Sequence, residues 1–289
     1  MTMYAKNWVV GFMICAGALM PSNAHAQGVG SDYQNLLNVF GWLSMQAATL
    51  RAQLYATSIE TSTPLPEIGT YRSMYYDGPY VSFYRVTDEG LVLAYGYSND
   101  FHARVFSLFE KIAGRENALT YIQEVRIYND PEAEYSAFVD EMGTTDRWIL
   151  GVNIADVFPN DEQWEVNLAQ LLIHEYAHIL FYYQSDVPDA FVSRFWTDTM
   201  KRSASVRESI SDASRRESVR DEYYALHKRT YVSPYATTNS EEDLAESFLA
   251  FVTEARGSGD SVRSQKQNFF YTYAALTEIR TRIRTNLSL

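Results

Sequence analysis

The 289-residue sequence contains a single cysteine, Cys15. This cysteine lies inside an apolar N-terminal run that we predict to be removed, so the mature chain carries no thiol. Disulfide bonds and thiolate metal ligands are therefore excluded, and core packing alone must hold the fold together. Any metal ion bound by the mature chain must be held by nitrogen and oxygen atoms.

The sequence also lacks an apolar run long enough to span a bilayer comfortably, which takes about 20 residues. The run from Trp8 to Met20 follows Lys6 and precedes AHA, a small-residue cleavage site that ends at Ala26. This order predicts a signal peptide over residues 1–26 with cleavage before Gln27; an uncleaved N-terminal anchor is the alternative. The mature protein is then expected to be secreted or periplasmic, with no stable membrane insertion.

Positive charge is scarce, because 24 Lys and Arg residues stand against 36 Asp and Glu, giving a formal net charge of -12 at pH 7. A chain this acidic is a poor candidate for binding nucleic acid or an anionic membrane surface, so neither is expected as a partner. The sequence is 46 % hydrophobic and 15 % aromatic. This content suffices for a packed core and favours a globular protein over a disordered one.

The chain after the signal peptide mixes helical and strand patterns. Apolar residues from Ser31 to Ile59 recur at spacings of three and four, which indicates an amphipathic helix. Two β-rich runs within Tyr71 to Tyr97 are separated by TDEG and predict a hairpin, and helical spacing returns from Phe101 to Ala113. Two further strands, Thr120 to Tyr128 and Arg147 to Ile154, are predicted to flank an acidic loop.

The stretch EVNLAQLLIHEYAHILFYY, from Glu165 to Tyr183, is apolar nearly all round and is typical of a buried helix. It carries His174, Glu175 and His178 in an HExxH pattern. The two histidines, at i and i+4, lie on one helical face, where both can reach a zinc ion at about 2.0–2.1 Å. Glu175 stands beside them, as a general base for peptide hydrolysis does. A chance match to the motif is the alternative.

The segments on either side of this helix carry less information. Pro159, Asn160 and Asp161 are predicted to cap its start, and Asp189 to Met200 is predicted to form a following helix. The stretch from Lys201 to Arg220 is rich in Ser, Arg and Glu and has few apolar residues. It is predicted to be an exposed helix or an insertion without a chemical role.

A catalytic zinc site usually has three protein ligands and one open position. The extended metzincin pattern, HExxHxxGxxH, is excluded because Phe181 and Gln184 stand where glycine and histidine are needed. The better source of a third ligand is Tyr235 to Val252, where Glu242 and Glu246 lie one turn apart on a predicted core helix. The alternative is an ordinary acidic helix start, since acids in a first turn suit the helix dipole.

Three segments follow one another along the chain: HEYAH, then SPYATTNSEEDLAESF, then SVRSQKQNFFYTYAALTEIRTRI. In order and in pattern they resemble the catalytic domain of the anthrax lethal factor type of gluzincin peptidase. The resemblance covers about one domain's length at the C-terminal end and not the N-terminal third. The chain departs from the family at Ala236, where glycine is often found, and in the Ser/Arg-rich interval before Glu242.

The resemblance implies roles for individual residues. It implies three ligands for one zinc ion per chain: His174, His178 and Glu242. Glu175 is then the catalytic base, and Tyr235 matches the tyrosine that hydrogen-bonds the oxyanion. Glu246 would accept a hydrogen bond from the far N–H of a ligating histidine.

We therefore predict an α+β fold, with an N-terminal helix and β-hairpin region over residues 27–118 and a zincin-like catalytic domain over 119–289. In zincins the strand beside the HExxH helix commonly pairs with an extended substrate backbone. The predicted strand here contributes three candidate substrate-binding residues: Trp148, Gly151 and Asn153. The expected activity is that of a secreted zinc endopeptidase acting on peptides or proteins. The alternative is a non-catalytic exported binding or envelope-associated protein that keeps a zincin fold.

Overall fold

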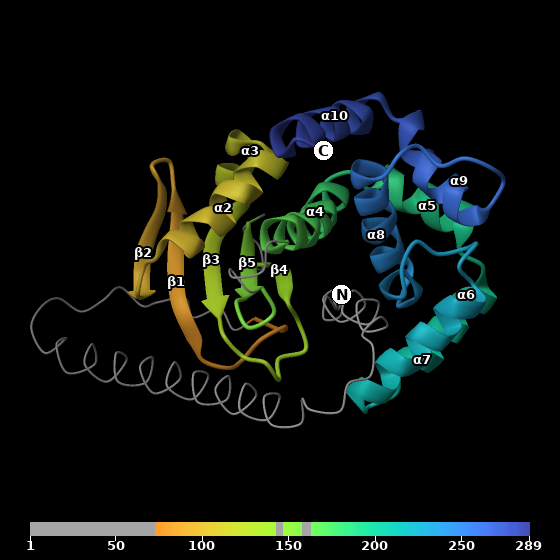
Figure 1. The fold of residues 1–289 in the computed structure, drawn as a ribbon, viewed down its shortest axis with the longest axis horizontal. Helices are drawn as coiled ribbons and strands as arrows, with labels where there is room; N and C mark the ends of the chain where they lie inside the picture. Colours follow the sequence, from red (N-terminus) through yellow and green to blue (C-terminus); the bar gives the residue numbers. More distant parts are fainter. Residues whose placement is uncertain (1–72, 143–146, 158–162) are drawn as a thin grey trace, which may run out of the picture. The chain divides into compact units, whose positions relative to one another are not determined.

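The computed structural model describes residues 73–142, 147–157 and 163–289, all of which belong to one compact unit. The predicted signal peptide, the predicted amphipathic helix from Ser31 to Ile59 and the predicted cap at Pro159, Asn160 and Asp161 lie outside these residues. The described part contains five strands and nine α-helices (Figure 1). The predicted α+β class is confirmed at this level.

The five strands form one sheet in the order β2-β1-β3-β5-β4. The strands are β1 (Tyr80–Thr87), β2 (Gly90–Gly96), β3 (Ile122–Tyr128), β4 (Ala137–Glu141) and β5 (Trp148–Asn153). β1 pairs antiparallel with β2 and with β3, β3 pairs parallel with β5, and β4 pairs antiparallel with β5. The sheet is therefore mixed, and β2 and β4 are its two edges.

The predicted hairpin is confirmed as β1 and β2, and it is part of this same sheet because β1 pairs with β3. The predicted boundary between residues 118 and 119 falls inside helix α3 (Arg115–Tyr121), which leads directly into β3. The hairpin and the strands that follow it thus share one continuous ladder of hydrogen bonds.

β4 corrects the predicted acidic loop between the two strands. Its first four residues are buried, including Asp140, whose carboxylate accepts a hydrogen bond from the Met74 N–H. Acidic residues are uncommon in strands, so this composition favoured a loop. This hydrogen bond from a residue far away in the sequence offsets part of the cost of burying the Asp140 charge, and the segment forms an edge strand.

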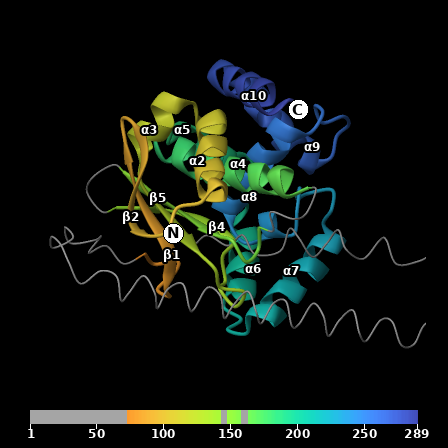
Figure 2. The same ribbon diagram turned by 60° about the vertical axis from the view of Figure 1, so that its left-hand side comes forward.

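Helices α2 (Asp100–Ala113) and α4 (Trp164–Tyr182) pack against each other on one face of the sheet (Figures 1 and 2). Both match predicted helices. α2 ends at Gly114, whose φ of 87° is a conformation that favours glycine and whose N–H bonds the Glu110 carbonyl. α4 is buried along most of its length, as its apolar sequence predicts.

The remaining helices all follow α4 in the chain, and the last of them also packs against α2. They are α5 (Asp186–Phe195), α6 (Asp198–Glu208), α7 (Ala213–Leu226), α8 (Ser240–Thr253), α9 (Val262–Phe269) and α10 (Ala274–Leu287), with 3-10 turns η2 (Tyr235–Thr237) and η3 (Phe270–Thr272). α8 packs directly on α4, and Phe181, Phe248 and Phe270 contact one another between them. The single helix predicted from 189 to 200 is divided at Trp196 into α5 and α6.

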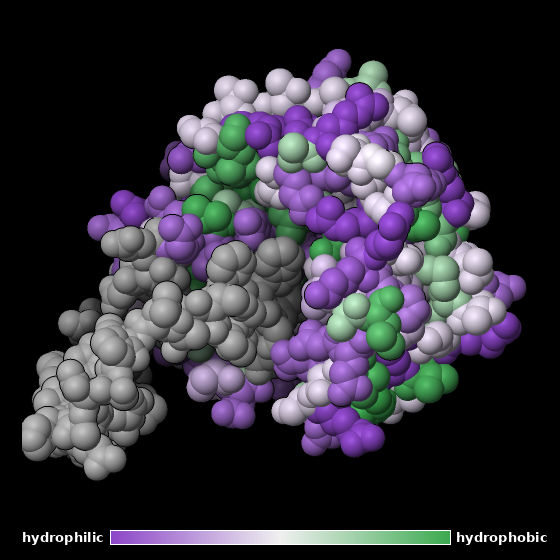
Figure 3. Space-filling view, turned by 45° about the vertical axis from the view of Figure 1, so that its right-hand side comes forward, coloured by the Kyte–Doolittle hydropathy of each residue, from purple (hydrophilic) through white to green (hydrophobic). Residues whose placement is uncertain are grey.

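The face of the molecule drawn in Figure 3 is mostly polar, with hydrophobic side chains in small groups. Val206 on α6 and Leu226 on α7 are among the exposed hydrophobic residues. Within the described residues no helix has the length and apolar character needed to cross a membrane.

Candidate metal centre

The HExxH residues lie in the middle of α4, and its two histidines face α8. His174, Glu175 and His178 are 2 %, 0 % and 7 % exposed. Burial of these three polar groups among apolar residues is unfavourable unless each has a partner or binds an ion. The hydrogen-bond partners of these three side chains therefore indicate whether they form a closed cluster or a site that binds an ion.

Helix α8 brings the acidic residues to this face of α4. The Asn239 side chain caps the helix by accepting hydrogen bonds from the N–H groups of Glu241 and Glu242. Glu242 lies in the first turn and Glu246 one turn later, and both are buried. The Asn239 cap thus fixes the start of α8 at Ser240. From this helix both carboxylates reach the histidines of α4.

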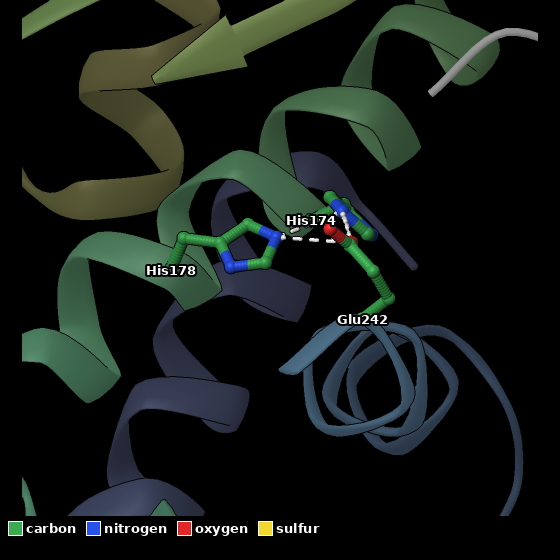
Figure 4. Close-up of side chains that lie close together, drawn as sticks. All are labelled: His174, His178 and Glu242. Atoms are coloured by element: carbon green, nitrogen blue, oxygen red, sulfur yellow. Dashed lines mark hydrogen bonds and ion pairs between the residues drawn. The ribbon is translucent and has the colours of Figure 1, made fainter. Parts of the chain in front are cut away.

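Three ligand atoms converge at the centre of this interface (Figure 4). The two Nε2 atoms of His174 and His178 are 3.0 Å apart, and Glu242 Oε2 lies 3.2 Å from the first and 3.4 Å from the second. Four ligands placed tetrahedrally at about 2.0–2.1 Å from zinc are about 3.3 Å from one another. His174, His178 and Glu242 thus form a buried group that can hold a metal ion.

The carboxylate oxygens of this site lack the hydrogen bonds that buried acids normally have. Neither oxygen of Glu242 and neither oxygen of Glu175 has a hydrogen-bond donor among the described residues. The close approach of Glu242 Oε2 to the imidazoles is therefore a convergence of acceptor atoms on a shared point. A cation at this point would be bound by the Glu242 carboxylate and the two Nε2 atoms, so the donor set fits a divalent metal with nitrogen and oxygen ligands.

Glu246 orients one of the histidines. Its Oε1 lies 2.7 Å from His174 Nδ1, and its Oε2 accepts a hydrogen bond of 2.5 Å from the Ser233 hydroxyl. A proton on Nδ1 leaves Nε2 free as a ligand, which is how a carboxylate commonly supports a metal-binding histidine. The role predicted for Glu246 beside a metal-binding histidine stays a prediction, and this contact is the one that it requires.

Tyr235 lies on η2, on the same side of the site as α8. Its ring centre is 5.7 Å from that of His174, and its hydroxyl is buried without a hydrogen-bond partner among the described residues. Burial raises the pKa of this phenol well above its ordinary value. The hydroxyl therefore stays protonated and remains available as a donor.

Burial and neighbouring charges shift the pKa values of the residues in the site. Burial raises the pKa of the Glu175 carboxyl to about 7, and burial lowers the pKa of the His178 imidazole. Burial also opposes a charge on His174, but the neighbouring carboxylates of Glu242 and Glu246 outweigh that effect and raise its pKa. Without a bound cation, the acidic residues thus hold a proton inside the site.

The three residues predicted to bind substrate lie on an inner strand, which corrects that prediction. β5 is hydrogen-bonded to β3 on one side and to β4 on the other, so its backbone has no free edge for a substrate. Trp148 donates to the Tyr183 hydroxyl, a Cβ on Gly151 would collide with the Phe138 ring, and Asn153 binds the loop around Asp130. The edge strand on this side is β4.

The Ser/Arg-rich stretch is helical and contains three buried arginines, contrary to its predicted exposure. Arg207 donates to the Thr237 carbonyl of η2 at 2.6 Å. Arg220 lies 5.8 Å from the Tyr235 ring centre and is held by Glu208 through two hydrogen bonds, and Arg216 pairs with Glu134. Arg207 and Arg220 thus contact the turn that carries Tyr235. The only signal in the sequence is the i, i+4 spacing of Arg216 and Arg220.

No family model matches the chain, and neither a curated protein nor a solved structure is significantly similar to it. The function must therefore be argued from the residues of the site.

Proposed function

We propose that this chain is an exported zinc-dependent endopeptidase with a zincin-like fold, of the gluzincin type that its sequence resembles. The observation that supports the proposal best is the convergence of His174, His178 and Glu242 on one buried point, with the unpartnered carboxylate of Glu175 beside it. Two histidines and a glutamate plus one open position form a common donor set of catalytic zinc in peptidases.

His174, His178 and Glu242 would hold the zinc ion, which when bound lowers the pKa of a water molecule to about 7 and polarises a carbonyl group. Glu175 takes the proton of the attacking water and delivers it to the leaving amine. Its raised pKa, caused by burial, suits a group that must both accept and donate a proton near neutral pH. Tyr235 donates a hydrogen bond to the oxyanion that develops on the substrate carbonyl.

The substrate class in this proposal is a peptide or unfolded protein in extended conformation. β4 is the edge strand that packs against α4, so among the described strands it replaces β5 as the candidate for backbone pairing with substrate. The acidic composition of the chain disfavours nucleic acid as a partner. The predicted signal peptide supports a secreted or periplasmic location.

The first test is the zinc content of the purified mature protein, measured by mass spectrometry. We expect one zinc per chain and an affinity about 10³-fold lower in Glu242→Ala, because one of three ligands is removed from a site worth about 10–16 kcal/mol in structural zinc proteins. Glu241→Ala is the matched control, since Glu241 lies in the same first turn without facing the histidines. A wild-type protein that binds no zinc after reconstitution would contradict the proposal.

The second test separates a peptidase from a protein that only binds zinc. The zinc-loaded wild type is incubated with a peptide library, and the products are read by mass spectrometry next to Glu175→Gln. We expect cleavage by the wild type only, with zinc retained by both proteins. Zinc binding without cleavage of any peptide would favour the non-catalytic exported protein.

A further inference from the structure

A second buried group of charged side chains lies on α8, immediately beside the candidate metal centre. Asp243 and Lys266 are both fully buried, and the Asp243 carboxylate accepts hydrogen bonds from Lys266 Nζ at 2.5 Å and from Trp196 Nε1 at 2.7 Å. The Ser247 hydroxyl lies 3.4 Å from its other oxygen. Lys266 Nζ also stands 4.1 Å from the centre of the Tyr231 ring. We name these five residues the α8 anchor.

The anchor connects α8 to three other stretches of chain. Trp196 lies between α5 and α6, Tyr231 precedes η2, and Lys266 belongs to α9. Successive residues of a helix are about 100° apart. Glu242 and Glu246 therefore share one side of α8, and Asp243 and Ser247 share the adjacent side. A rotation of α8 that moved the first pair would break the contacts of the second.

Stability alone is a poor explanation of a buried ion pair. The desolvation of two charges often exceeds their attraction, and well-packed apolar residues of similar volume are frequently as stable or more stable. A fully hydrogen-bonded buried network does impose one arrangement on the elements that it joins. The anchor thus restricts how α8 can rotate and slide.

The metal centre needs this restriction. Glu242, Glu246 and Glu175 are all acidic and buried close together, so they repel one another whenever they are ionised without a cation. Ligand distances to a metal are fixed within about 0.2 Å. A helix that carries one ligand and one supporting carboxylate is therefore best held by contacts on another of its sides, and Asp243 and Ser247 supply them on the adjacent side.

We propose that Asp243 and Lys266 are positioning residues, which set the rotation of α8 so that Glu242 and Glu246 face His174 and His178. This inference rests on the proposed metal centre. Neither residue touches the ligand atoms, and the effect passes through the helix itself.

The test compares variants in which the charges are removed in pairs, because a single substitution would leave one buried charge unpaired. Asp243→Leu/Lys266→Met removes the anchor's polar contacts. Asp243→Asn/Lys266→Gln keeps amide groups that can remake them. Glu124→Leu/Arg126→Met is the matched control, since this pair is also buried and lies on β3. Circular dichroism and thermal unfolding identify a temperature at which every variant is folded.

The first readout is zinc affinity, measured by chelator competition, with the visible spectrum of the cobalt-substituted protein as a report on ligand geometry. We expect the Leu/Met double variant to bind zinc about 10- to 100-fold more weakly, as when a supporting residue of a metal site is lost. The Asn/Gln double variant should lie closer to wild type. The β3 control should stay within about twofold, because distant sites act independently.

The second readout requires no metal. In ¹⁵N-histidine-labelled metal-free protein, the His174 Nδ1 proton held by Glu246 should resonate far downfield, and this signal should disappear in the Leu/Met variant. Wild-type zinc affinity, cobalt spectrum and proton signal in that variant would overturn the proposal, as would an equal loss of affinity in the β3 control. Loss of the proton signal in a protein whose wild type binds no zinc would instead reject the proposed metal centre and support the positioning role.

Discussion

Two neighbouring residues of α8, Glu242 and Asp243, belong to two buried groups that differ in whether their carboxylates have hydrogen-bond donors. In the α8 anchor the Asp243 carboxylate has donors from Lys266, Trp196 and Ser247, so the charges balance within the protein. In the candidate metal centre Glu242 and Glu175 have no hydrogen-bond donor among the described residues. The first group is complete, whereas the second has excess negative charge and acceptor atoms.

The difference separates a structural cluster from a site. Buried polar groups without partners are unfavourable by about 1–3 kcal/mol each, and more when they are charged. Such a cost persists where function requires it, because a ligand that binds there supplies the missing partner. A completed cluster offers a ligand nothing. The comparison predicts that removing a charge will act in opposite directions in the two groups.

The largest expected effect is on the anchor. Lys266→Met leaves the Asp243 charge buried and unpaired, so the free energy of unfolding should fall by about 3–5 kcal/mol. Adding Asp243→Leu should restore most of that loss. Urea unfolding of the three proteins measures both steps. An unchanged single variant would mean that the two residues do not form the ion pair described here.

The next effect is on turnover. Tyr235→Phe removes a hydroxyl that has no hydrogen-bond partner among the described residues, so zinc affinity and stability should change little while turnover falls about 10²- to 10³-fold. Tyr231→Phe is the matched control, because it removes the hydroxyl of another buried tyrosine but keeps the ring that faces Lys266, so the anchor should hold and turnover should stay unchanged. Equal turnover in the Tyr235 variant and wild type would remove Tyr235 from the mechanism.

Glu175→Gln should stabilise the metal-free protein, whereas the anchor variant Lys266→Met should destabilise it. Burial raises the pKa of Glu175 to about 7 from its ordinary value of 4.5. The folded state thus binds the proton more tightly than the unfolded state, and wild-type stability is lost as pH rises from 4.5 to 7. The variant should gain up to about 3 kcal/mol at pH 8 and less than about 1 kcal/mol at pH 5.

Urea unfolding of metal-free wild type and variant at these two pH values provides the measurement. A gain at pH 8 that is no larger than the gain at pH 5 would show that the Glu175 carboxylate is ionised at low cost and has a partner in the protein. The metal centre would then resemble the anchor, and the contrast between the two groups would fail.

The parts of the site that could be predicted from the sequence are those with a short-range pattern. His174 and His178 are one turn apart on α4, and Glu242 and Glu246 one turn apart on α8, so helical periodicity alone showed which side chains share a face. Their approach to each other came from the family resemblance and not from spacing. The main sheet strands and α2 followed from the same kind of local pattern.

The parts that were missed depend on partners far along the chain. Acidic β4 is an edge strand because it pairs with β5, and Arg216 is buried because Glu134 lies opposite it. Asp243 and Lys266 are separated by 23 residues. Each is a charged residue of a type that usually lies on the surface. Charged residues at buried positions cannot be assigned from composition, since burial is decided by the partner.

The smallest predicted effect, that of Glu246→Gln, decides whether the acids of α8 serve the metal or merely the start of the helix. The glutamine keeps the shape of the side chain and can still accept from His174 Nδ1, but it removes the charge that raises the basicity of the ligand. Zinc affinity should therefore fall about 10-fold, at the lower end of the range for such supporting residues. Glu241→Gln removes an acid from the first turn, where the helix dipole acts, and should leave zinc affinity unchanged. If both variants lose the same affinity, the acids act through the dipole and the general charge of the region; if only Glu246→Gln does, the carboxylate acts through His174.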